Sequence, residues 1–483
     1  MRHRLPVLAL LLLVALALRG WDFGNPVIHV DEQYYLLVGD RLAHGARVYL
    51  DIWDRKPIGL FLLYAGFARV GDGILAYQLG ATLSATLTAA AIMAGGRRLG
   101  ATPRGALLAA IAYLLWLPLL GGRGGQAPVF YNLPMALAAL LTLRLPRLVA
   151  AERRATIAGQ GALACLLAGV ALQLKGSALF EGVFFGMAHL VAMRRSGTGW
   201  AGTALLGSGL ALSGAALTLA AGGFYGAQGG AAWHIWWFAN VDSIFLRPPY
   251  PLAQSLGRLA GIGATLSPLI LAAALGLAGR LRGSRRDEAW LALGWGIAAL
   301  IGFAAIGTFF DHYALPLLVP LCVAAAPTLG AKPRVRVGAL GLGLLLFAVE
   351  RAFVPDDAAG ARAVARAVAA NSRGACPYVF SGDTITYHLA RVCLPTRYAF
   401  PNFLAYTTER SATGIDAGAE VRRILARRPP VIVTSDRRLA IWNPASLAAL
   451  KPVLARDYRV ILTVPRASWH SVVYLRRDLS ARR

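Results

Sequence analysis

The stretch from Ile28 to Tyr64 gathers residue types that can carry out acid, base and phosphate chemistry. An adjacent acidic pair, Asp31 and Glu32, directly follows the first apolar segment of the chain. A second charged cluster stands just before the next apolar run and consists of Asp51, Asp54, Arg55 and Lys56. A carboxylate at a membrane surface can deprotonate a hydroxyl as it attacks, if desolvation raises its basicity. The alternative is that Asp31 and Glu32 are solvated charges at a helix N-terminus.

The composition indicates that these groups are carried by a membrane protein. Hydrophobic residues make up 57% of the 483 residues, only 15% are charged, and the mean hydropathy is +0.56. Soluble domains average about 45–50% apolar and about 25% charged residues. The net charge of +26 does not indicate nucleic-acid binding, because the basic residues recur in alternate short loops rather than on one soluble segment.

Long apolar runs predict about eleven transmembrane helices. We expect them near residues 5–20, 74–95, 105–120, 133–149, 157–173, 178–193, 200–222, 259–280, 289–307, 314–330 and 337–354. One set of helix ends carries 18 basic and three acidic residues. By the positive-inside rule these ends are cytoplasmic, so the N-terminus lies inside and the tail lies outside. The first run could also be a cleaved signal peptide, but we expect an uncleaved anchor, extended by a snorkelling Arg19.

The remaining sequence divides into outer segments. Residues 21–73 carry the acidic pair, and residues 223–257 carry a cluster of tryptophans and Arg247. Residues 1–354 therefore form a transmembrane module, and residues 355–483 a C-terminal domain outside the membrane. Helical and apolar strand patterns in this tail predict a small α/β domain with strands near 377–381, 431–434, 458–464 and 470–476. It contains Cys376 and Cys393, for which an oxidising compartment permits either a disulfide or two free thiols.

Three stretches resemble C-type (GT-C) glycosyltransferases of the protein O-mannosyltransferase and lipid A aminoarabinose transferase superfamily, glycosyltransferase family 39 in the broad sense. The first is DEQYYLLVGDRLAHGARVYLDIWDRKP, residues 31–57, which combines the acidic pair with a Gly45, Tyr49, Asp51 turn and Lys56-Pro57. The others are VALQLKGSALF, residues 170–180, and FFDHYALPLLVP, residues 309–320. The resemblance covers about residues 5–354 and implies a GT-C-like helical membrane fold.

The resemblance also implies a reaction. A hexosyl or pentosyl group would pass from a polyprenyl-phosphate carrier to a lipid, glycan or protein acceptor, on the outer face of a bacterial inner membrane. Asp31 would be the general base, supported by Glu32. A positive charge stabilises a departing phosphate, and the residues expected to supply it are Lys56, Arg55, Lys175 and His312. Further pocket candidates are Tyr34, Tyr35, Asp51, Asp54, Asn132, Arg247, Asp311 and Tyr313.

The chain departs from the family pattern in ways that bear on a metal. Arg55 stands directly before Lys56, where the aminoarabinose transferases tend to carry an acid, and Asn132 stands where they often have aspartate. The loss of the aspartate at position 132 weakens the case for a divalent cation, so we predict no cofactor.

Two other classes of function remain open. A transporter or flippase is also polytopic, but transporters usually place ionisable groups at the membrane midplane in two related halves. Here Lys175 lies close to a span end, and no halves repeat. A relative that binds lipid-linked glycans without transferring sugar is the other alternative, since Arg55 and Asn132 depart from the pattern.

Overall fold

The computed structural model describes residues 4–482, and the chain divides into two compact units. The helical unit comprises Met1–Phe23, Gln78–Ala221 and Pro251–Phe353. The mixed unit comprises Gly24–Tyr77, Gly222–Tyr250 and Val354–Arg483. Contacts therefore group residues 24–77 and 222–250 with the C-terminal tail.

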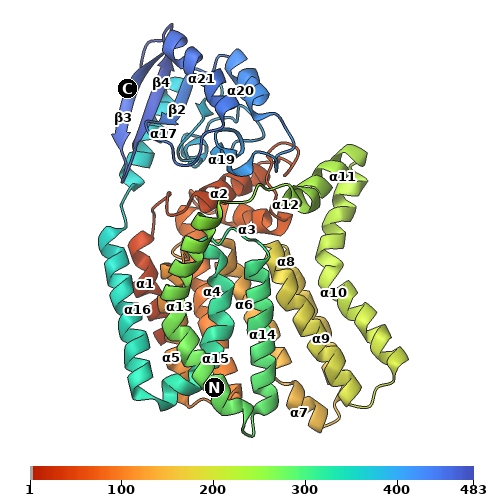
Figure 1. The fold of residues 1–483 in the computed structure, drawn as a ribbon. Coiled ribbons are helices and arrows are strands. Elements are labelled where there is room, and N and C mark those ends of the chain that lie inside the picture. The colour runs from red at the N-terminus through yellow and green to blue at the C-terminus, as the bar shows by residue number, and fades with distance from the viewer. Residues whose placement is uncertain (1–3, 483) are drawn as a thin grey trace. The chain divides into compact units, whose positions relative to one another are not determined.

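The helical unit is built from long apolar helices that run side by side (Figure 1). Its helices are α1 (Arg4–Arg19), α4 (Ile74–Arg98), α5 (Pro103–Leu119), α6 (Ala127–Thr142), α7 (Leu145–Ala150), α8 (Arg154–Leu172), α9 (Leu179–Arg195), α10 (Trp200–Ala227), α13 (Leu252–Leu281), α14 (Arg286–Ala304), α15 (Leu318–Ala331) and α16 (Pro333–Phe353). Short 3-10 turns are η1 (Gly20–Asp22), η2 (Gly176–Ala178), η4 (Asp311–Tyr313) and η5 (Leu315–Leu317). Every predicted span coincides with a helix, the fourth being shared by α6 and α7.

Nine helical stretches among residues 4–482 are long and apolar enough to cross a membrane. The other two expected spans, Pro103–Leu119 and Leu315–Ala331, are shorter. Both are buried along most of their length, because they pack against other helices rather than facing outward. Small residues allow this close packing. A Cβ added to Gly105 would strike the Ala326 carbonyl of α15, and one added to Gly276 of α13 would strike the Ala324 carbonyl.

The basic helix ends and the segment around His312 lie at opposite ends of the helical unit. At one end Arg280, at the end of α13, donates a hydrogen bond to the Gly100 carbonyl that follows α4, at 2.9 Å. At the other end Gly121, just after α5, lies beside His312 of η4. The basic helix ends and the His312 segment are therefore separated along the bundle, as the alternating loops predicted.

Arg19 corrects one expectation. Its side chain does not snorkel but is 1% exposed, inside the helical unit. The guanidinium donates to the Thr82 hydroxyl at 3.1 Å and to the carbonyls of Gly122 and Gly124. A buried guanidinium requires acceptors of this kind, so Arg19 ties the end of α1 to α4 and to the loop after α5.

The mixed unit combines helices with one sheet (Figure 1). Its elements are α2 (Val30–Ala43), α3 (Ile58–Ala68), α11 (Gly230–Trp237), the π-helical η3 (Phe238–Asp242), α12 (Ser243–Phe245), α17 (Ala358–Ser372), β1 (Tyr378–Val379), α18 (Thr386–Leu389), α19 (Pro401–Leu404), η6 (Thr407–Glu409), α20 (Ala417–Ala426), β2 (Val431–Ser435), α21 (Pro444–Asp457), β3 (Tyr458–Pro465) and β4 (His470–Arg476). The strand order is β1-β2-β4-β3, with β1 parallel to β2 and the other pairs antiparallel.

The α/β character expected for the tail is confirmed, and all four strands lie where the apolar runs predicted them. Strand β2 is buried along its whole length, as a central strand should be. Cys376 and Cys393 form a disulfide, which decides between the alternatives left open by the sequence. Cys165 and Cys322 are buried in the helical unit.

Candidate active site

Helix α2 presents the acidic pair in its first turn. His29 is the N-cap, and its Nδ1 accepts a hydrogen bond from the Asp31 backbone N–H at 3.2 Å. Glu32 is fully buried, while Asp31 is only partly buried. Both carboxylates lie where the helix dipole favours negative charge, but only Asp31 retains access to solvent. The two side chains thus face different surroundings, as expected for successive positions on a helix.

Two tyrosines further along α2, Tyr34 and Tyr35, fix the helix against its neighbours. The Tyr34 hydroxyl donates to the Trp53 carbonyl at 2.6 Å, and its ring stacks on Phe400. Tyr35 packs edge-on against Tyr64 of α3, with ring centroids 5.5 Å apart. Both tyrosines are buried, and these contacts position α2.

The loop between α2 and α3 separates Asp51 from the rest of the second charged cluster. Asp51 accepts hydrogen bonds from the backbone and side chain of Arg47 and closes an exposed turn. Tyr49 has a φ of +71°, an unusual conformation for a residue with a side chain. Its hydroxyl donates to the Lys56 carbonyl at 2.8 Å. The Gly45–Asp51 motif therefore shapes the loop and holds the Lys56 backbone in place.

Asp54 and Lys56 form an ion pair at the end of this loop. Lys56 Nζ lies 3.4 Å from Asp54 Oδ2 and 4.9 Å from the centroid of the Tyr35 ring. Burial raises the pKa of Asp54, and the charges of Lys56 and Arg55 offset part of that rise, while Asp31 adds to it. The ammonium group of Lys56 thus lies beside the Asp54 carboxylate and over an aromatic ring, an arrangement that localises a cation.

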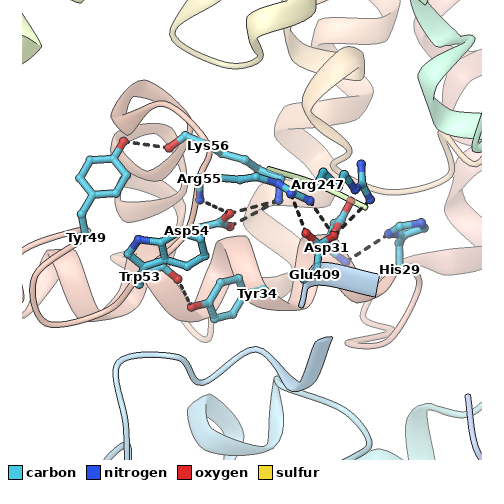
Figure 2. A network of polar contacts seen from close by, with 10 residues as sticks. All are labelled: His29, Asp31, Tyr34, Tyr49, Trp53, Asp54, Arg55, Lys56, Arg247 and Glu409. Carbon is cyan, nitrogen blue, oxygen red and sulfur yellow. Dashed lines mark hydrogen bonds and ion pairs between the residues drawn. The ribbon is translucent and has the colours of Figure 1, made fainter. Parts of the chain in front are cut away.

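Two arginines converge on one carboxylate beside this pair (Figure 2). Arg55 contacts both oxygens of Glu409 at 2.6 Å, and an Arg247 nitrogen lies 3.1 Å from Glu409 Oε1. Arg55 and Arg247 are both sequence-predicted, but Glu409 is not. A lone glutamate in a turn of the tail belongs to no sequence motif. Only the fold brings it to Arg55, which is 354 positions away in the sequence, and to Arg247, which is 162 positions away.

A second contact that the sequence does not reveal anchors the start of α2. Gln33 donates to Asp383 Oδ1 at 3.2 Å, and its own side-chain oxygen accepts from the Ile385 N–H. Asp383 is in turn paired with the buried Arg466 at 2.7 Å. Because Gln33 directly follows the acidic pair, this network fixes the helix turn that carries Asp31 and Glu32.

The remaining predicted residues belong to the helical unit. Lys175 Nζ lies 4.0 Å from the centroid of the Tyr313 ring, and the rings of Tyr313 and His312 are 4.5 Å apart. His312 is buried, whereas Asp311 is exposed at the start of η4. Arg258, which the sequence did not single out, lies 3.9 Å over the Phe310 ring. A cluster of cations and aromatic rings therefore surrounds residues 310–313 at one end of the bundle.

Asn132 lies outside this cluster, in the interior of the helical unit. It is buried within α6 and donates to the Leu315 carbonyl at 3.2 Å and toward the Tyr113 hydroxyl at 3.4 Å. These contacts connect three helical segments. Among residues 4–482, no three His, Cys, Asp or Glu side chains are grouped so that they could hold a metal ion.

Comparisons with known proteins identify the fold. No protein-family model and no curated protein sequence matches the chain. In structure it is similar to ArnT from Cupriavidus metallidurans, crystallised with undecaprenyl phosphate, with a TM-score of 0.63 and 16% identity over 97% of both chains. It is also similar to the archaeal oligosaccharyltransferase AglB from Archaeoglobus fulgidus, in complex with an inhibitory peptide and a dolichol-phosphate. That TM-score is 0.57, at 10% identity over 95% of this chain and 79% of AglB. Both are GT-C glycosyltransferases, and this chain has the GT-C fold expected from its sequence.

Proposed function

We propose that this protein is a glycosyltransferase that moves a sugar from a polyprenyl-phosphate carrier to a cell-envelope acceptor. The observation that carries the proposal is the fold match to ArnT along 97% of both chains, since that protein was crystallised with a polyprenyl phosphate. The cluster of carboxylates and cations around the start of α2 supports it, because this reaction needs a base and a phosphate-binding cation. By the positive-inside rule, the α2 segment and the tail face the periplasmic side.

In the proposed step Asp31 acts as the general base. It accepts the proton of the acceptor hydroxyl as that oxygen attacks the anomeric carbon. The bond between this carbon and the phosphate oxygen breaks, its electron pair stays on the phosphate, and the configuration of the sugar inverts. Asp31 suits this role because it is the more accessible member of the pair. The buried Glu32 would act by orienting the helix turn rather than by touching the acceptor.

Lys56 is the proposed cation for the departing phosphate. Its Nζ is held over Tyr35 and beside Asp54, so it needs little reorganisation to receive negative charge. Lys175 and His312 of the helical unit remain the other phosphate-binding candidates predicted from the sequence. If the acceptor is itself a phosphate rather than a hydroxyl, no base is needed, and Asp31 would serve positioning alone.

A transfer assay with purified membranes tests the proposal. Radiolabelled polyprenyl-phosphate sugars would be supplied to wild type, Asp31→Asn and Asp436→Asn at matched expression. Asp436 is an exposed carboxylate of the mixed unit that pairs with His470, so it controls for the loss of one acid. We expect Asp31→Asn to reduce transfer about 10²–10⁴-fold, and Asp436→Asn to leave it unchanged.

The other outcomes are equally informative. Undiminished transfer by Asp31→Asn removes this carboxylate from catalysis and favours a phosphate acceptor. No transfer by wild type from any donor contradicts the glycosyltransferase proposal. In that case, movement of the intact lipid-linked sugar across the membrane would identify a flippase, and binding without movement would identify a non-catalytic relative.

A further inference from the structure

Glu409 occupies a place built for an anion. Its carboxylate receives Arg55 from the loop before α3 and Arg247 from the segment after α12, and all three side chains are largely buried. The planar guanidinium fork fits carboxylate and phosphate oxygens equally well. Two such forks contact the one carboxylate of Glu409. The pair of arginines therefore has the charge and the geometry to receive a phosphate in place of Glu409.

The carboxylate comes from a short turn rather than from a rigid element. Glu409 ends η6, a single 3-10 turn whose start is fixed by the Thr407 N–H bond to the Ile441 carbonyl. Further on, Gly414 has a φ of +69°, and its Cα faces the Phe238 ring closely enough that a Cβ would clash. The two ends of the turn are thus held, while the Glu409 side chain can leave the arginines by rotating its own torsion angles.

We propose that Glu409 is an internal competitor, which occupies the Arg55–Arg247 pair until the phosphate of the polyprenyl-phosphate donor displaces it. The proposal rests on the function proposed above and adds a residue that sets donor affinity. In this arrangement the apparent dissociation constant equals the intrinsic one divided by the fraction of molecules in which the arginines are released. If the carboxylate holds the pair in about nine molecules of ten, its removal should tighten donor binding about tenfold.

Binding without transfer provides the test. Purified full-length protein in detergent would be titrated with undecaprenyl phosphate, with undecaprenol and with inorganic phosphate, following tryptophan fluorescence. We expect Glu409→Gln to bind undecaprenyl phosphate about tenfold more tightly than wild type, and undecaprenol with unchanged affinity. The matched control is Glu420→Gln, which removes a carboxylate paired with Arg423 instead and should leave both affinities unchanged.

A double variant shows where the gain comes from. Adding Arg55→Gln to Glu409→Gln should abolish the tighter binding, because the released guanidinium is then missing. If Glu409→Gln also binds inorganic phosphate more tightly, the arginine pair recognises the phosphate group itself. If only the affinity for undecaprenyl phosphate rises, the polyprenyl chain of the ligand contributes to binding. Either result supports the proposal. If Glu409→Gln does not accumulate in cells, Glu409→Asp can replace it, because the shorter side chain retracts the carboxylate by one methylene. This variant should bind undecaprenyl phosphate more tightly than wild type, but by less than the tenfold expected of Glu409→Gln.

The same titration distinguishes a failure of the Glu409 proposal from a failure of the proposed function. If wild type binds undecaprenyl phosphate and Glu409→Gln, folded as judged by its thermal unfolding, binds it equally or more weakly, Glu409 is a structural ion-pair partner and this proposal is overturned. If wild type does not bind undecaprenyl phosphate above undecaprenol, both this proposal and the proposed function fall.

Discussion

Removing the charge of Lys56 should destabilise the mixed unit far more than removing the charge of Asp54. Asp54 is 1% exposed and Lys56 is 22% exposed at the side chain, so the carboxylate depends more on the pair than the ammonium does. Breaking a buried ion pair from one side costs about 3–5 kcal/mol, because the other charge stays buried. In Lys56→Met the Arg55 N–H still donates to Asp54 at 2.6 Å, so we expect the lower end, about 3 kcal/mol.

The complementary changes complete a double-mutant cycle. Asp54→Asn leaves Lys56 partly solvated and over the Tyr35 ring, so it should cost only about 1 kcal/mol. Lys56→Met combined with Asp54→Asn should recover most of the loss, since no uncompensated charge remains. Thermal unfolding of the purified full-length variants measures this, and losses that simply add in the double variant would refute the reasoning. The double variant also separates stability from function, because it should fold and yet lose about 10²-fold in transfer rate.

The pH dependence has a definite sign. A carboxyl group whose pKa is raised by folding, as burial raises that of Asp54, stabilises the fold at low pH, and this contribution is lost as pH rises through the folded pKa. The positive charge of Lys56 lowers the pKa of folded Asp54, so Lys56→Met raises that pKa further. Stability then continues to fall with rising pH up to a higher pH than in wild type. The deficit of Lys56→Met relative to wild type should therefore be larger at about pH 8 than at about pH 5. A deficit that grows on acidification would contradict this.

Two further predictions concern packing and the disulfide. A Cβ on Gly39 would lie 2.6 Å from the Tyr64 backbone, so Gly39→Ala should cost about 1–3 kcal/mol in thermal unfolding. Gly66→Ala, where no atom lies within 4 Å, should cost nothing, and equal losses would contradict the packing argument. Reducing the Cys376–Cys393 disulfide, whose cysteines are 17 positions apart in the sequence, should lower stability by about 3 kcal/mol. Unfolding curves that coincide with and without reductant would show that the bond does not constrain the unfolded chain.

Local sequence patterns were sufficient to predict the helices and strands of this fold. The transmembrane helices and the four strands of the tail are encoded by apolar runs and their length, and these depend only on neighbouring residues. The burial of Glu32 beside a more accessible Asp31 likewise follows from successive positions on a helix. The grouping of residues 24–77 and 222–250 with the tail could not be foreseen, because it is decided by contacts between distant segments.

The same distinction explains what was missed in the candidate site. Asp51 resembles Asp54 in the sequence, but its Arg47 partner draws it into an exposed turn. Arg19 at the end of an apolar run is typical of a snorkelling residue, and only the carbonyls supplied by the loop after α5 make its burial favourable. Glu409 has no local signal at all, since both of its partners lie in other parts of the chain.

Competition by Glu409 would also help the product to leave. The donor phosphate is a diester with one negative charge, whereas the polyprenyl phosphate released by transfer is a monoester, which at neutral pH carries about −1.5 to −2. Cations that stabilise the departing phosphate therefore hold the product more tightly than the donor, and release of product limits many enzymes. A carboxylate that returns to Arg55 and Arg247 replaces part of that attraction. Glu409→Gln should thus be inhibited by undecaprenyl phosphate more strongly than wild type, and equal inhibition would mean that Glu409 stays in place during turnover.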